Sequence, residues 1–189
     1  MCKRLIPLLL LLMACNLVSN TGSEQELQIT QPANTPSPDV PSGQQATDTR
    51  VGFTFAYPDG WTLIAPQNTS DAVAYSYTVQ SFEPPAAGSG GFPEDESKVD
   101  IHVNPTDTAS LESIRARLGE DEANNILIIH NKERLTLDAG LEALVIQATG
   151  FKGGSFTGIY TVINDHEVAL TEIGDEQYLW QVANSLRVN

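Results

Sequence analysis

Cysteine is nearly absent from this chain of 189 residues. The two cysteines, Cys2 and Cys15, both lie close to the N-terminus, so the rest of the chain cannot form a disulfide of its own. Small exported domains often depend on disulfides when their hydrophobic core is too small. The remainder of this chain must instead be stabilised by an ordinary hydrophobic core, and it is long enough to form one.

Basic residues are also scarce. The chain has 10 Lys and Arg against 24 Asp and Glu, which gives a formal net charge of −14. Proteins that bind nucleic acid need a basic surface that displaces the counterions of the phosphates. The composition therefore excludes nucleic acid as a partner, and anionic lipid headgroups should repel the body of the protein.

No apolar run near the N-terminus reaches the roughly 20 residues of a membrane-spanning helix. The run Leu5 to Leu12 follows Lys3 and Arg4 and ends in Leu12-Met13-Ala14-Cys15, which is the order of a removable export signal. The last four of these residues resemble the lipobox of bacterial lipoproteins. The resemblance implies a signal peptide over residues 1–14 and acylation of Cys15 by diacylglycerol and a palmitate-type chain. A plain secretory signal, in which Cys15 is incidental, is the alternative.

A lipidated Cys15 would place the protein on the extracytoplasmic side of the cell membrane, because two or three acyl chains form a stable anchor. Loss of Lys3 and Arg4 with the signal would lower the net charge from −14 to −16. Residues 15–50 are rich in Pro, Ser, Thr and Gln and predict a disordered tether. A flexible chain of about 35 residues spans roughly 30 to 35 Å.

The globular domain is predicted over residues 51–189. Phe53, Phe55 and Tyr57 alternate along a strand that ends at the turn Pro58-Asp59-Gly60, and Trp61 leads the next strand. The predicted core includes Phe55, Tyr57, Trp61 and Trp180. We expect Trp61 to pack under a helix as the largest single contributor to this core.

The domain contains further strand patterns on either side of one helix. Residues 72–82 and 98–104 alternate with period two, and Val99, Ile101 and Val103 should face inward. Thr108 can cap a helix that carries an apolar stripe of Leu111, Ile114 and Leu118. Between these strands, Glu83 to Ser97 holds three prolines and three glycines and predicts a long loop.

Four more strands and a closing helix complete the pattern. The strands are predicted over residues 126–137, 141–149, 155–163 and 167–173. Turn residues join them, which favours an antiparallel meander. Asp175 can cap the last helix, in which Leu179, Val182, Ala183 and Leu186 recur at helical spacing. The sequence thus predicts an α+β fold with an antiparallel β-sheet flanked by helices.

Several of these segments together resemble the PsbP-like family. The segments are Phe53 with Tyr57-Pro58-Asp59-Gly60-Trp61, the strand ending at Asn104, the helix begun by Ser110-Leu111-Glu112, the hairpin around Gly140 and the closing Asn184-Ser185-Leu186-Arg187. The family (PsbP/DcrB type) includes the extrinsic subunit of the plant oxygen-evolving complex and many exported bacterial lipoproteins. The resemblance implies an α/β/α sandwich with a non-enzymatic, accessory or binding role, and it brings no catalytic residue.

Candidate metal ligands are few and have simpler explanations. Asp100 and His102 share one strand face, which is also what a solvated face looks like, and His130 follows an apolar stretch. Asp165-His166-Glu167 fits a turn. The runs Glu94-Asp95-Glu96 and Glu120-Asp121-Glu122 lack the alternating oxygens and glycine of a calcium loop. We therefore assign no metal site and no cofactor from the sequence.

No nucleophilic site is recognisable either. There is no Gly-x-Ser-x-Gly elbow, and Gly150 to Gly154 lacks the Lys-Ser/Thr ending of a phosphate loop. We expect a non-enzymatic, lipid-anchored interaction module that docks on an extracytoplasmic assembly, through the loop from Glu83 to Ser97. A small-molecule or cation-binding protein, with a pocket between sheet and helix, is the alternative, and an envelope hydrolase is a third possibility.

Overall fold

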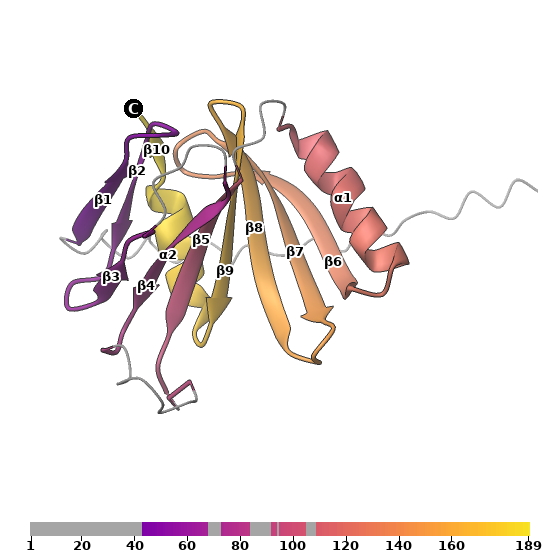
Figure 1. Ribbon diagram of the computed structural model, residues 1–189, viewed down its shortest axis with the longest axis horizontal. Helices are drawn as coiled ribbons and strands as arrows, with labels where there is room; N and C mark the ends of the chain where they lie inside the picture. Colours follow the sequence, from indigo (N-terminus) through magenta and orange to yellow (C-terminus); the bar gives the residue numbers. More distant parts are fainter. Residues whose placement is uncertain (1–42, 68–72, 84–91, 94, 105–108) are drawn as a thin grey trace, which may run out of the picture.

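The computed structural model describes residues 43–67, 73–83, 92–93, 95–104 and 109–189. Two antiparallel sheets and two helices make up this part of the chain (Figure 1). The larger sheet has the order β3-β4-β5-β9-β8-β7-β6, and the smaller has the order β1-β2-β10. The strands are β1 (Gln44–Asp48), β2 (Phe53–Tyr57), β3 (Thr62–Ile64), β4 (Tyr75–Gln80), β5 (Lys98–Asn104), β6 (Leu127–Thr136), β7 (Glu142–Gly150), β8 (Ser155–Ile163), β9 (His166–Ile173) and β10 (Arg187–Val188).

The period-two pattern of β5 is confirmed over the whole predicted range. Val99, Ile101 and Val103 are fully buried, whereas His102 on the other face is exposed. The strand is held on both sides, by β4 and by β9. β4 itself is shorter than the predicted strand of residues 72–82, and Val73, which lies within the predicted range but before β4, is exposed.

The predicted meander is confirmed as β6 to β9, each strand antiparallel to the next. The β8–β9 turn places Asn164 and Asp165 at φ values of 48° and 64°. These are left-handed conformations that Asn and Asp tolerate better than most residues, so the turn can be tight. A bulge near His130 interrupts the register of β6, the outermost strand of the sheet.

The boundary of the tether at residue 50 is wrong. β1 begins at Gln44 and pairs along its length with β2. Its last residue, Asp48, is fully buried and accepts hydrogen bonds from the hydroxyls of Tyr75 (2.7 Å) and Tyr77 (2.9 Å). Asp48 also accepts the backbone N–H groups of Arg50 and Val51. The composition around β1 is polar, so strand pairing and this one buried carboxylate hold a segment that lacks an apolar pattern.

The two helices lie on opposite faces of the large sheet. α1 (Leu111–Ala123) packs on β6, β7 and β8, while α2 (Glu176–Ser185) packs on β2, β5 and β9. Alternate residues of β7 point into two separate hydrophobic cores, one between the sheet and α2 and the other between the sheet and α1. Ala143 and Val145 belong to the first core, and Leu144 and Ile146 to the second. The α+β architecture with helices flanking an antiparallel sheet is therefore confirmed.

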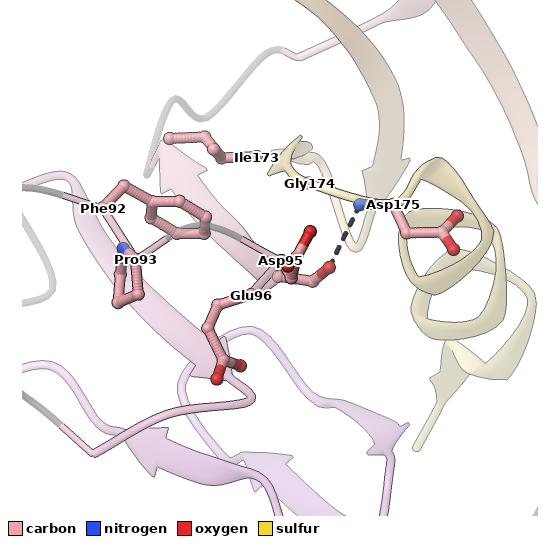
Figure 2. A pocket seen from close by; sticks show the side chains of 8 residues that line it. Phe92, Pro93, Asp95, Glu96, Ile173, Gly174 and Asp175 are labelled. Atoms are coloured by element: carbon pink, nitrogen blue, oxygen red, sulfur yellow. Dashed lines mark hydrogen bonds between the residues drawn. The ribbon is translucent and has the colours of Figure 1, made fainter.

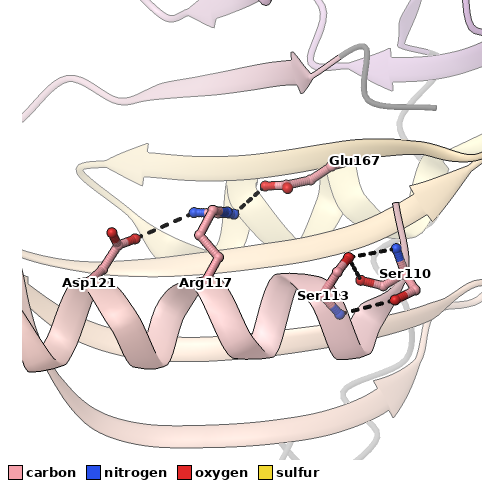
Figure 3. Close-up of polar contacts among 5 residues, drawn as sticks. All are labelled: Ser110, Ser113, Arg117, Asp121 and Glu167. Atoms are coloured by element: carbon pink, nitrogen blue, oxygen red, sulfur yellow. Dashed lines mark hydrogen bonds and ion pairs between the residues drawn. The ribbon is translucent and has the colours of Figure 1, made fainter. Parts of the chain in front are cut away.

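The N-terminal cap of one helix was predicted correctly from the sequence, and that of the other was not. Asp175 caps α2 as predicted, and Leu179, Val182, Ala183 and Leu186 are all fully buried. α1 is capped by Ser110 and not by Thr108, which lies outside the described residues. Ser110 and Ser113 exchange hydrogen bonds as a capping box (Figure 3), which satisfies the first free backbone donors of the helix.

The four predicted core residues fall into two groups. Phe55 and Tyr57 are buried between β2 and the large sheet. Trp61 and Trp180 are only partly buried and pack on the outside of the same core. Trp61 does lie against a helix, with its ring 4.6 Å from that of Tyr178 in α2. It is not the centre of the core, because Phe53 and Phe55 occupy that place.

The N-terminal predictions, including the signal peptide and Cys15, lie outside the described residues. Within the described part, neither helix has the length and apolar character needed to cross a membrane.

Candidate functional site

An open hollow of about 620 Å³ lies at one end of the large sheet (Figure 2). The start of β5, the end of β9 and the β7–β8 turn meet at this end (Figure 1). We call it the lower end of the sheet. The hollow sits between the segment before β5, the end of β9 and the start of α2. Its lining residues are Phe92, Pro93, Asp95, Glu96, Ser97, Ile173, Gly174 and Asp175.

Ser97 holds the walls of the hollow together. Its side chain is buried, and its Oγ accepts the backbone N–H of Asp175 at 3.0 Å. Its own backbone N–H donates to Ser81 Oγ at 2.9 Å, and the Ser81 N–H donates to the Ser97 carbonyl at 3.0 Å. The last residues of the predicted loop are thus tied to the end of β4 and to the cap of α2. Residues 84–91 and 94 of that loop lie outside the described residues.

Gly174 allows the two walls to approach each other. Its φ of 108° is strained for any residue with a side chain, and a Cβ there would lie 2.5 Å from the Glu96 carbonyl oxygen and from Ser97 Oγ. The backbone of the β9–α2 connection therefore packs directly on the segment before β5. This contact requires a glycine.

The hollow has an apolar part with two exposed side chains. Phe92 is 37% exposed and Ile173 is 48% exposed. Phe92 is supported from behind by Phe82, whose ring meets it edge-on at 5.3 Å. Apolar side chains that are supported on one side and open on the other offer area that a partner can bury.

The rim of the hollow is acidic. Asp95, with a left-handed φ of 63°, is exposed, and Glu96 accepts a hydrogen bond from the Ser81 hydroxyl. Asp175 accepts the N–H of Gln177 at 3.0 Å as the cap of α2. The salt bridges found in the described residues join other carboxylates to Lys98, Arg117 and Arg134. Of the three carboxylates, that of Asp95 is exposed and has no salt bridge among those of the described residues.

Glu172 adds to this acidic end of the molecule. The pKa of its carboxyl is raised to about 7, mainly by burial and to a smaller extent by the Glu176 carboxylate, while hydrogen bonds from the backbone N–H groups of Glu172 and Thr157 oppose the shift. One oxygen of Glu172 is buried without a hydrogen-bond partner. A carboxyl with such a pKa changes between its protonated and ionised forms near neutral pH.

Asp100 and His102 lie on one face of β5, as predicted, but each has a neighbour on the same sheet. Asp100 pairs with Lys98 at 2.6 Å and accepts the Thr78 hydroxyl. His102 Nδ1 is 2.7 Å from Ser76 Oγ on β4. The contacts with Thr78 and Ser76 are cross-strand pairs between β4 and β5, whereas the Lys98–Asp100 ion pair lies within β5.

The other candidate ligands are also engaged in structural contacts. Glu167 is buried and pairs with Arg117 of α1 at 2.5 Å, and Arg117 reaches Asp121 on its other side at 3.5 Å (Figure 3). His130 contacts Thr149, and His166 contacts the Asn164 carbonyl. Among the described residues, no three His, Cys, Asp or Glu side chains come together where they could hold a metal ion. Glu94 lies outside these residues.

Ser97 is not placed like a catalytic nucleophile. Its hydrogen-bond partners are the backbone of Asp175 and of Ser81 and the Ser81 hydroxyl, and no histidine is among them. What the hollow offers is an apolar floor and a negative rim, which suit binding.

Sequence reasoning located one wall of the hollow and missed the other. It pointed to the loop from Glu83 to Ser97, but Ile173 and Gly174 come from the end of a strand some distance along the chain. It also missed Ile126, Ile128 and Phe151, which are exposed at the same lower end. Phe151 is 86% exposed at the tip of the β7–β8 hairpin. An aromatic residue between Gly150 and Gly153 was the one signal in the sequence that could have revealed it.

The fold and the site define an α+β domain whose antiparallel sheet carries helices on both faces and an acid-rimmed hollow at one end. No family model matches this chain, and no curated protein matches it. Among solved structures, the chain is similar to the solution structure of cyanobacterial PsbP (CyanoP) from Synechocystis sp. PCC 6803. The two are 15% identical with a TM-score of 0.48, over 77% of this chain and 92% of that chain.

Proposed function

We propose that this protein is a lipid-anchored, extracytoplasmic interaction module of PsbP-like type without catalytic activity. Acyl chains on Cys15 would hold it on the cell membrane, and the domain would dock on an envelope protein through the hollow at its lower end. The lipobox-like Leu12-Met13-Ala14-Cys15 and the Pro-rich segment after it support the anchor. The net charge of −14 supports a partner other than nucleic acid.

The observation that carries the docking role is the placement of exposed apolar side chains. Phe92 and Ile173 lie open in the hollow, and Ile126, Ile128 and Phe151 are exposed at the same end of the sheet. Phe92 and Ile173 belong to the walls that Ser97 joins, and exposed apolar side chains at one end of a domain are typical of a surface that binds another molecule.

A small-molecule or cation-binding protein is the alternative, favoured by the carboxylates at the rim of the same hollow. The two roles differ in what stabilises the isolated protein. A cation or metabolite that binds the native state must raise the melting temperature. A thermal-shift screen with Ca²⁺, Mg²⁺ and metabolite mixtures therefore separates them, and a clear shift would favour the alternative.

The anchor is tested by Cys15→Ala in cells fed labelled palmitate. We expect the parent to incorporate label and sediment with membranes, and Cys15→Ala to lose both properties. A variant that is still labelled and sediments normally would refute the lipoprotein assignment. Crosslinking in intact cells, followed by detergent extraction of the full chain, tests the docking role, because an interaction module must give a discrete crosslinked product with an envelope protein.

A further inference from the structure

The lower-end hollow combines two properties that restrict what can occupy it. Its open part is apolar, from Phe92 and Ile173, and its rim carries the exposed carboxylate of Asp95. The Glu96 carboxylate accepts the Ser81 hydroxyl, and the Asp175 carboxylate points over α2, which it caps (Figure 2). A metal ion would gain nothing from the apolar floor, and a purely apolar ligand would leave the charged rim unmatched. An occupant with both cationic and apolar groups matches both.

Charge complementarity extends beyond the rim. Glu176 lies next to the hollow at the start of α2, and the whole chain carries a net charge of −14. Two lysines also lie at this end: Lys98, opposite Ile173 in the β5–β9 register, is paired with Asp100 at 2.6 Å, and Lys152 lies in the β7–β8 turn. A net charge of one sign raises the rate of encounter with partners of the opposite sign. The same net charge disfavours a second copy of this chain, because two chains that each carry a charge of −14 repel each other.

We propose that the hollow binds a basic, apolar polypeptide segment of its envelope partner, in which Lys or Arg residues flank a bulky apolar side chain. This inference rests on the docking role proposed above and adds the chemistry of the partner. The apolar side chain would lie against Phe92 and Ile173, and a flanking cation would pair with the exposed Asp95. A hollow of about 620 Å³ is large enough for one or two side chains rather than for a folded domain.

A synthetic peptide tests the proposal directly. The probe is acetyl-Lys-Lys-Leu-Phe-Leu-Lys-Lys-amide, titrated into the full chain while its fluorescence anisotropy is followed. One control peptide replaces every Lys by Glu, and another replaces the Leu-Phe-Leu centre by Ser-Ser-Ser. We expect binding of the first peptide alone, weakening as NaCl is raised because ion pairs near the surface are screened. Equal binding of either control peptide would overturn the proposal.

Two matched pairs of variants locate the binding. Ile173→Ser should weaken binding of the peptide about fivefold. Val188→Ser, at a side chain that is equally 48% exposed, should change the peptide affinity by no more than about twofold. Asp95→Asn should weaken binding of the peptide about threefold. Asp165→Asn should leave the peptide affinity unchanged, and Asp165 is a matched control because it is exposed and has nearly the same φ as Asp95 (64° against 63°). Because all four side chains are exposed, the variants should fold, and far-ultraviolet circular dichroism checks this. Equal effects within either pair would refute the placement.

Each other occupant of the hollow would give a different experimental result. A dimer in sedimentation that Ile173→Ser dissociates would assign the hollow to a second copy of the chain and overturn the proposal. Crosslinking separates this inference from the docking role. An envelope crosslink that survives both Ile173→Ser and Asp95→Asn would leave the docking role standing and refute the hollow as the basic-segment site. Peptide binding without any envelope crosslink would refute the docking role and leave the chemistry of the hollow supported.

Discussion

The side-chain oxygen of Ser97 accepts the backbone N–H of Asp175 across 3.0 Å, and this bond joins the segment before β5 to the cap of α2. The two residues are far apart in the chain and form opposite walls of the same hollow (Figure 2). The stability of the domain and the shape of its candidate site therefore depend on the same contact. The first prediction tests this dependence.

Gly174→Ala should destabilise the domain by about 3 kcal/mol, because the new Cβ would overlap the Glu96 carbonyl and the backbone has a positive φ. Gly119→Ala is the matched control. Gly119 lies within α1 with no heavy atom within 4 Å of the new Cβ, so alanine there should stabilise by about 0.5 to 1 kcal/mol. Urea denaturation measures both, and equal stabilities would contradict the close approach of the walls.

Asp48→Ala should cost about 3 to 4 kcal/mol, because it leaves the buried hydroxyls of Tyr75 and Tyr77 without their shared acceptor. Tyr77→Phe should cost about 1 kcal/mol in the parent and much less in the Asp48→Ala background. Asp59→Ala, in the exposed turn after β2, should change stability by less than about 0.5 kcal/mol. A Tyr77→Phe effect that is the same in both backgrounds would show that the two side chains act independently.

The raised pKa of Glu172 predicts a pH-dependent stability. The folded state favours the protonated carboxyl, whose pKa is about 7, whereas the ordinary pKa of a glutamate carboxyl is 4.5. The parent should therefore lose stability as the pH rises from 4.5 to about 7, and Glu172→Gln should lose less. Chemical denaturation at a series of pH values measures this, with exposed Glu120→Gln as the control. Identical pH profiles for the parent and Glu172→Gln would contradict the prediction.

Trp61→Ala should leave a folded protein that is about 2 kcal/mol less stable, because Trp61 is only partly buried against Tyr178. Phe55→Ala should cost about 3 to 5 kcal/mol, since Phe55 is 1% exposed within the core. Thermal melts rank the two. A larger loss for Trp61→Ala would restore the expectation that the tryptophan is the main core residue.

Local patterns were sufficient for most of the elements in the domain. The alternation of Val99, Ile101 and Val103 marked β5, and Asp175 marked the start of α2. Such signals are carried by residues close together in the chain, so sequence reasoning recovers them. β1 escaped detection because its order depends on pairing with β2 and on the buried Asp48, neither of which leaves a periodic apolar pattern.

By itself, the sequence determined the α+β class, the antiparallel meander and the absence of a disulfide after Cys15, because periodicity, turn residues and composition are local properties. Only the tertiary structure decided which ends of the strands meet. The antiparallel order of the large sheet brings the end of β9 beside the start of β5, and there Gly174 packs on Glu96 and Ser97. The hollow results from that non-local contact, which no pattern within either segment encodes.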